Sequence, residues 1–173
     1  MKNIIFFVSV MISLAMCPLQ DGYPVPPDCP SRMFYIQHAN NHNTFVYDAN
    51  FTASKAIKDA DPIHVYRINY KKGGIKEELT NMQRKMAYGV EFTKTGCNTF
   101  DFTLAAYPSK KMTLKLCGEN NPRVSVHING KTIHLKRMFL FCNKLGTSVS
   151  SINFYGKDAV SGREVTENFA IND

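Results

Sequence analysis

The sequence predicts a mainly β protein, an antiparallel β-sandwich or meander that carries one amphipathic helix. Three observations support this fold class. Apolar and polar residues alternate through most of the chain, an Asn-Gly pair marks a tight hairpin, and one segment changes to a helical period. An α+β fold is the alternative, because the helix would cover one side of a sheet.

The N-terminus has the features of a secretory signal peptide. A short basic start, MKN, precedes the apolar stretch IIFFVSVMISLAM, which is shorter than the roughly 20 residues of a membrane span. We expect residues 1–17 to be removed, with cleavage near residues 15–17. Residues 18–31 then form an extended Pro-rich leader, and residues 32–173 form a single β-rich domain. A lipid anchor at Cys17 is the alternative, whereas no later segment is apolar enough to cross a membrane.

The first elements after the leader read as strands. MFYIQ and TFVYD flank the turn-forming residues Ala39–Asn43, which predicts a hairpin. His38 and His42 are four apart, but the turn formers disfavour a helix, so we expect both histidines to satisfy local backbone groups instead of a metal. HVYRINY, residues 64–70, then alternates as a half-buried strand.

One segment, GGIKEELTNMQRKMAYG, has a helical period. Ile75, Leu79, Met82 and Met86 fall on one stripe, with acidic residues in the first turn and basic residues in the last. Gly89 is placed to end the helix. We expect this stripe to pack on the sheet.

The remaining chain predicts hairpins. TFDFTLAAY and KMTLKL alternate on either side of a turn at YPSKK, and two final strands are joined through Ser161-Gly162. Asn129-Gly130 fits a two-residue type I′ turn. This turn places Ile128 opposite Lys131 and continues the pairing outward from there.

Four cysteines follow Cys17, namely Cys29, Cys97, Cys117 and Cys142. An even number in an exported chain favours two disulfides, with three pairings open. Their spacing does not fit a structural zinc site. Asn50-Phe51-Thr52 is a glycosylation sequon if the host is a eukaryote.

The net charge of +7 falls to +6 when Lys2 leaves with the signal peptide, since 20 basic residues then face 14 acidic ones. Outside the cell this favours an acidic glycan, an anionic membrane surface or another extracellular protein as a partner, and we expect no nucleic acid. The Asn-Gly hairpin also places His127 and His134 diagonally on one face, close enough to share a metal with a third ligand. A solvent-facing polar stripe is the alternative.

Motifs for catalysis are missing from the sequence. It contains no G-x-S-x-G elbow, no phosphate-binding loop and no dinucleotide-binding glycine motif. We therefore expect no cofactor and favour a non-enzymatic module.

One series of residues runs through the chain: Phe34–Gln37, Asn43-Thr44 with Tyr47, Pro62–Ile68, and Gln83-Arg84 with Ala87-Tyr88-Gly89. This series resembles an exported family of bacteria and some eukaryotes that is known only as a domain of unknown function. The resemblance spans most of residues 33–165, and its most distinctive part is the Gln-Arg-x-x-Ala-Tyr-Gly element at residues 83–89. It implies architecture and compartment, but no catalytic residues. The candidate binding residues that it implies are Gln37, Asn43, Tyr47, Tyr66, Gln83, Arg84 and Tyr88. The alternative role for each is a buried hydrogen bond that ties the helix to the sheet.

These observations predict a secreted β-rich domain that binds a partner through a polar sheet face or the crevice between helix and sheet. A metal-assisted hydrolase using His127 and His134, and a lipid-anchored envelope protein, are the alternatives.

Overall fold

A computed structural model describes residues 19–20, 22–143, 145 and 148–171. The predicted signal peptide and Cys17 lie outside these residues. The strands are β1 (Leu19–Gln20), β2 (Tyr23–Pro24), β3 (Arg32–His38), β4 (Asn41–Ala49), β5 (Ile63–Asn69), β6 (Ile75–Glu78), β7 (Val90–Gly96), β8 (Thr99–Leu104), β9 (Tyr107–Leu116), β10 (Pro122–Ile128), β11 (Lys131–Cys142), β12 (Val149–Asp158) and β13 (Glu164–Ala170). A 3-10 turn, η1 (Tyr70–Lys72), precedes β6. The helix α1 (Asn81–Gln83) continues as a π-helical turn, η2 (Arg84–Tyr88), and we call residues 81–88 the helical segment.

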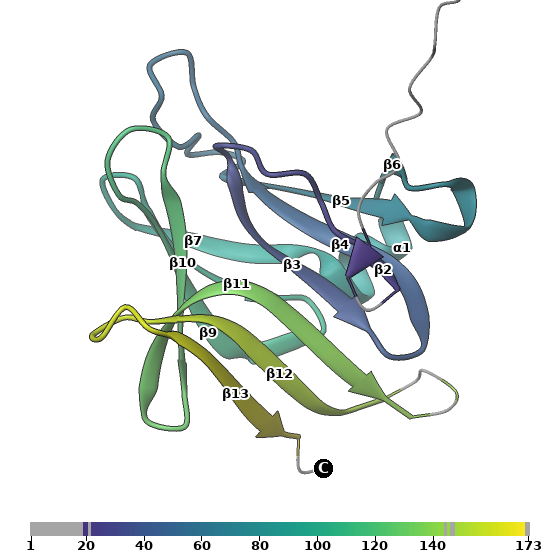
Figure 1. The fold of residues 1–173 in the computed structure, drawn as a ribbon. Coiled ribbons are helices and arrows are strands. Elements are labelled where there is room, and N and C mark those ends of the chain that lie inside the picture. The colour runs from purple at the N-terminus through teal and green to yellow at the C-terminus, as the bar shows by residue number, and fades with distance from the viewer. Residues whose placement is uncertain (1–18, 21, 144, 146–147, 172–173) are drawn as a thin grey trace, which may run out of the picture.

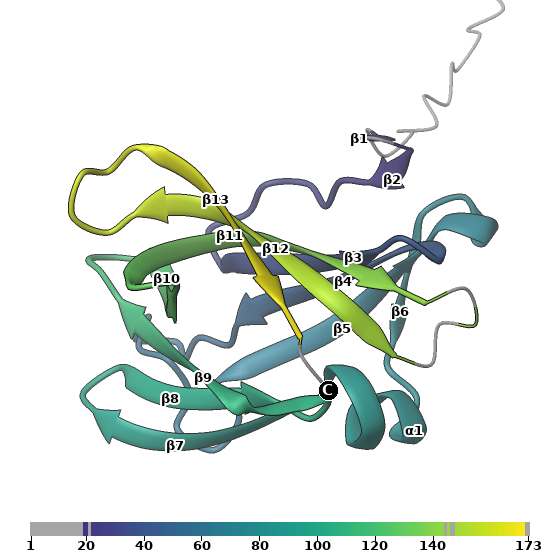
Figure 2. The ribbon, with the colours of Figure 1, turned by 90° about the horizontal axis from the view of Figure 1, so that it is seen from below.

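Most strands form one curled, mixed sheet (Figures 1 and 2), which confirms the mainly β fold class. The strand order is β6-β5-β4-β3-β11-β10-β9-β8-β7, and β12 and β13 extend from β11. β3 and β11 run parallel, whereas the other pairs among the described strands are antiparallel. The parallel pair therefore joins an N-terminal leaf, β3 to β6, to the rest of the chain.

The core lies between this N-terminal leaf and the leaf formed by β7 to β10, and β11 and β12 also contribute buried side chains to it. Phe34 and Tyr47 stack within the first leaf, with ring centroids 4.4 Å apart, and Phe34 also meets Phe102 of the second leaf at 6.3 Å. All three side chains are buried. These contacts hold the two leaves together, because burial of an aromatic side chain is a large favourable term in folding.

The helix is shorter than the sequence predicts. Ile75–Glu78 is a strand that pairs with β5, and the helical segment starts only after Thr80. Leu79 is buried as expected, but Met82 is 75% exposed and Met86 is 73% exposed. Ile75 is 50% exposed as well, so the predicted stripe does not pack on the sheet, and three of its four members face solvent.

The hairpin predictions have mixed outcomes. The Asn129-Gly130 turn is confirmed, because Ile128 pairs with Lys131 and Ser125 pairs with His134 as expected. The turn predicted at YPSKK lies elsewhere: Leu104 pairs with Tyr107, so the turn is Ala105-Ala106 and β9 already includes Pro108.

The predicted leader is extended, but it packs against the outer face of the sheet. Tyr23 and Pro24 are buried. The carbonyl of Pro24 accepts hydrogen bonds from Gln37 Nε2 at 3.1 Å and Thr44 Oγ1 at 2.6 Å. Figure 2 shows this segment crossing above β3.

The two predicted disulfides are not formed. Cys29, Cys97, Cys117 and Cys142 are free thiols in the structure. Cys29 contacts Asp48 near the start of β3, whereas Cys142 contacts His38 at its end. A strand of seven residues separates these positions by about 20 Å, so these two thiols cannot pair.

Candidate functional site

A crevice between the helical segment and the sheet is the best candidate for a binding site. Its volume is about 450 Å³. Its lining is apolar apart from a few polar groups, and it contains no Lys, Arg, Asp or Glu among the described residues. The lining residues are Ile36, His38, Met86, Ala87, Tyr88, Leu104, Ala106, Tyr107, Met138, Leu140, Cys142, Ser148, Val149, Ile152 and Ile171. An apolar pocket with a few convergent polar groups is typical of a small-molecule site.

Three polar side chains meet in this crevice. His38 Nε2 lies 2.7 Å from the hydroxyl of Tyr88, and His38 Nδ1 lies 3.8 Å from Cys142 Sγ. They come from the end of β3, the end of the helical segment and the end of β11. We call this set the Cys-His-Tyr chain. It is assembled because parallel pairing places Leu140 beside His38, two residues before Cys142.

All three groups are uncharged near neutral pH. Burial lowers the pKa of His38 to about 4, since its side chain is mostly removed from water. Burial also raises the pKa of the Cys142 thiol, and it raises the pKa of Tyr88 with a further contribution from the nearby Cys142. The chain is therefore a set of neutral hydrogen-bonding groups, without a thiolate or an imidazolium.

The backbone around Tyr88 holds its side chain in place. Tyr47 donates its hydroxyl to the carbonyl of Tyr88 at 2.9 Å, and the ring of Tyr88 stacks on Phe45 with centroids 3.5 Å apart. The carbonyls on either side, from Ala87 and Gly89, accept from the backbone of the Ala105-Ala106 turn.

Gly89 is required by this geometry. A Cβ atom at this position would lie 2.0 Å from the carbonyl oxygen of Arg84, which is far below a van der Waals contact. The backbone at Gly89 is extended, so the predicted end of the helix is correct, but its cause is close approach to Arg84 and not a left-handed cap. This explains the last residue of the Gln-Arg-x-x-Ala-Tyr-Gly element.

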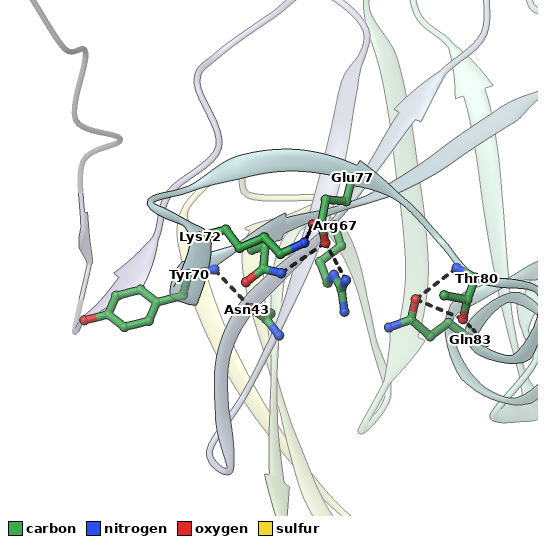
Figure 3. A network of polar contacts seen from close by, with 8 residues as sticks. Asn43, Arg67, Tyr70, Lys72, Glu77, Thr80 and Gln83 are labelled. Carbon is green, nitrogen blue, oxygen red and sulfur yellow. Dashed lines mark hydrogen bonds and ion pairs between the residues drawn. The ribbon is translucent and has the colours of Figure 1, made fainter.

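The start of the helical segment is fixed by a capping box and an ion-pair network (Figure 3). Gln83 accepts from the backbone of Thr80 at 3.0 Å, and Thr80 Oγ1 accepts from the backbone of Gln83 at 3.2 Å. Upstream, Glu77 accepts hydrogen bonds from Lys72 at 2.7 Å and from Asn69 at 3.0 Å, and it also pairs with Arg67. These partners lower the pKa of Glu77 to about 2. The network joins β6 to β5, and thus sets where the helical segment begins.

The family of the chain can now be stated. The family model described as Domain of unknown function (DUF4833) matches residues 34–168. The chain belongs to this family. The match includes the whole Cys-His-Tyr chain. No curated protein and no solved structure matches the sequence.

Of the candidate residues in this DUF4833 domain, Tyr88 alone lines the crevice. Tyr47 does not line it but donates to the carbonyl of Tyr88, and Gln83 takes part in the capping box of the helical segment. The others lie elsewhere: Gln37 holds the leader, Asn43 Oδ1 accepts from the backbone of Tyr70 at 3.0 Å, Tyr66 accepts from Arg32 at 3.0 Å, and Arg84 lies 3.8 Å from Glu78. None of these four contacts is the buried hydrogen bond between helix and sheet that the alternative expected: Gln37 is buried but bonds to the leader, and the pair of Arg84 with Glu78 is exposed.

The histidine pair of the hairpin has other neighbours. His134 Nδ1 lies 3.0 Å from Ser125 Oγ, and His127 Nδ1 lies 3.4 Å from Thr132 Oγ1. No group of three or more His, Cys, Asp or Glu side chains gathers in the described part of the chain.

At the sequon, Asn50 Nδ2 donates to Asp61 at 2.9 and 3.0 Å, so a glycan there would replace these bonds.

Two of the three residues of the Cys-His-Tyr chain were missed by sequence reasoning. We expected His38 to lie in a polar loop and Cys142 to form a disulfide. His38 is in fact the last residue of β3 and 7% exposed. Its alternation with Phe34 and Ile36 was the one sequence signal that could have placed it on the core face.

No helix of the described residues is long and apolar enough to cross a membrane.

Proposed function

We propose that this domain is a secreted, non-enzymatic binding module whose crevice holds a small ligand with an apolar body and an uncharged hydrogen-bonding head. The observation that carries this proposal is the neutral Cys-His-Tyr chain in a crevice whose lining is otherwise mostly apolar. Such a site favours apolar groups along its walls and one polar group at the chain.

The neutral state of the Cys-His-Tyr chain disfavours ligands with a charged head group. A carboxylate or an ammonium group would lose its hydration in the crevice without meeting an opposite charge among the lining residues. An alcohol, amide or ester would instead exchange its bonds with water for bonds to Tyr88.

The same charge state argues against cysteine catalysis. A nucleophilic cysteine needs a thiolate, which a neighbouring imidazolium or helix N-terminus stabilises. Here burial raises the pKa of Cys142 and lowers the pKa of His38, so both groups favour their neutral forms. This supports binding over nucleophilic attack.

The neutral chain has two hydrogen arrangements. Either Cys142 donates to His38, which donates to Tyr88, or Tyr88 donates to His38, which donates to Cys142. In the first arrangement the Tyr88 hydroxyl can donate to a ligand, and in the second its oxygen can accept. The crevice can therefore receive heads of either kind.

Binding of a neutral, environment-sensitive dye such as N-phenyl-1-naphthylamine tests the proposal. Ala106 lines the mouth of the crevice and is exposed, so Ala106→Trp should block entry and abolish the dye signal. Ala53→Trp is the matched control, because Ala53 lies in an exposed turn away from the crevice. The proposal fails if the dye does not bind, or if both variants reduce binding equally.

Competition between ligands of equal chain length tests the head. A long-chain alcohol should displace the dye, whereas the matching carboxylate and ammonium compounds should displace it weakly. Tyr88→Phe should weaken the alcohol about fivefold, the loss expected for one hydrogen bond, without changing dye affinity. Stronger competition by the carboxylate would contradict the neutral-head proposal.

A further inference from the structure

The helical segment presents two exposed methionines. Met82 and Met86 are 75% and 73% exposed, although the sequence pattern assigns them to the apolar face of a helix. Met86 also lines the crevice. Exposed apolar side chains at the edge of a binding site are typical of a surface that contacts a partner.

A second exposed apolar side chain lies close in sequence to residues that line the crevice. Leu145 is 84% exposed, and it lies in the loop between Cys142 and Ser148, which both line the crevice. Figures 1 and 2 show the helical segment and the end of β11 at the same end of the sheet. Exposed apolar side chains therefore occur next to crevice-lining residues in two parts of the chain.

The chain around the helical segment is also basic. Between Tyr70 and Tyr88 it contains Lys71, Lys72, Lys76, Arg84 and Lys85 against Glu77 and Glu78, five positive against two negative charges, a net +3. Lys85 is exposed and stands between the two methionines in sequence. Apolar side chains bordered by lysine and arginine are the pattern of proteins that bind at an anionic membrane interface.

We propose that this end of the domain docks on an anionic lipid bilayer, with Met82, Met86 and Leu145 entering the interface and Lys85 near the lipid headgroups. This rests on the proposed function for its purpose, since docking would place the crevice opening against the bilayer. The ligand class is then a neutral amphiphile that passes between the bilayer and the crevice. The partner chemistry follows from charge complementarity together with the exposed methionines.

Vesicle flotation of the exported protein, with its N-terminus established by mass spectrometry, tests the docking. The protein should float with vesicles of phosphatidylcholine that contain phosphatidylglycerol, and much less with phosphatidylcholine alone. Met82→Ser should weaken binding about tenfold, through loss of the burial of its side chain, and Lys85→Gln about fivefold. Neither residue lines the crevice, so dye binding in solution should stay unchanged in both.

Val160→Ser is the matched control. Val160 is 96% exposed in the turn between β12 and β13, at the opposite end of β12 from the crevice, and its substitution should not change flotation. The proposal is overturned if the wild-type protein does not float, or if Val160→Ser weakens flotation as much as Met82→Ser. It is also overturned if Lys85→Gln releases the protein while Met82→Ser does not, because this would indicate a purely ionic partner such as an acidic glycan.

The two proposals can fail separately. Dye binding without flotation would leave the binding module in place and remove the bilayer. Flotation without dye binding would leave the docking surface and remove the crevice ligand.

Discussion

Acidification should destabilise this protein through His38. The pKa of this residue is about 4 in the folded protein, because burial disfavours the imidazolium, against 6.5 for an unperturbed histidine. Above about pH 6.5 neither state is protonated there. Between about pH 6.5 and pH 4 the unfolded chain binds a proton that the folded protein does not. Stability is therefore lost as the pH falls through this window.

The size of this loss follows from the two pKa values. Each unit of difference corresponds to about 1.4 kcal/mol, so the complete loss is about 3 kcal/mol once the pH is below about 4. At about pH 5 the loss should already be about 2 kcal/mol relative to about pH 8. The loss at about pH 5 is roughly a tenth to a half of the 5–15 kcal/mol that is typical of the stability of a domain.

Urea unfolding at a series of pH values measures this loss. His38→Gln keeps a hydrogen-bonding group beside Tyr88 but cannot titrate, so its free energy of unfolding should fall much less between about pH 8 and pH 5. His127→Gln is the control, because His127 is exposed. It should show the wild-type pH dependence. Equal slopes for the wild type and His38→Gln would refute the reasoning, even if His38→Gln is less stable at every pH.

Three further predictions concern the elements that position the site. Gly89→Ala should destabilise the protein by about 2 kcal/mol or more, because its Cβ would overlap the Arg84 carbonyl. Gly96→Ala should have a small effect, because its Cβ would meet Thr99 at an ordinary 3.6 Å. Similar urea midpoints for the two variants would contradict this. Glu77→Gln should lower the urea midpoint at neutral pH more than Glu78→Gln, since Glu77 has three partners and a pKa of about 2. This difference between the variants should disappear as the pH falls from about 4.5 to 2. A difference that persists in acid would count against the ion pairs. Under non-reducing conditions the four cysteines that follow Cys17 should all react with a maleimide, exposed Cys97 first and Cys142 slowly. A ligand in the crevice should slow Cys142 further, and resistance of a pair of cysteines would indicate a disulfide.

Local patterns predicted the parts of the fold that local contacts determine. The Asn129-Gly130 turn needs positive φ at both positions, and both have it, so the register of the β10–β11 hairpin followed from two residues. Alternation likewise predicted β8 as a strand, and every second residue of β8 is buried. In each case the partner strand is adjacent in sequence.

The candidate site depends on contacts that have no local signal. His38 and Cys142 are 104 residues apart, and they meet because β3 pairs with β11 in parallel. A parallel pair needs a long connection, so neither strand indicates its partner in the sequence. The cysteine count then favoured disulfides, which assigned Cys142 to the wrong role.

The helix prediction was wrong in extent because one pattern fits two structures. Ile75, Glu77 and Leu79 would also share one face of a strand, and Glu77 lies opposite Arg67 across β5 and β6. The ion pair is gained only if residues 75–78 are a strand, and the turn at Gly73-Gly74 lets the chain return to β5. Tertiary pairing thus overrides helical propensity here. The strand shortens the helix to residues 81–88, and this leaves Met82 and Met86 without a sheet to cover them. The exposed methionines and the placement of Tyr88 therefore have a common cause, since the pairing of β6 with β5 determines both where the helix starts and which side chains surround the crevice.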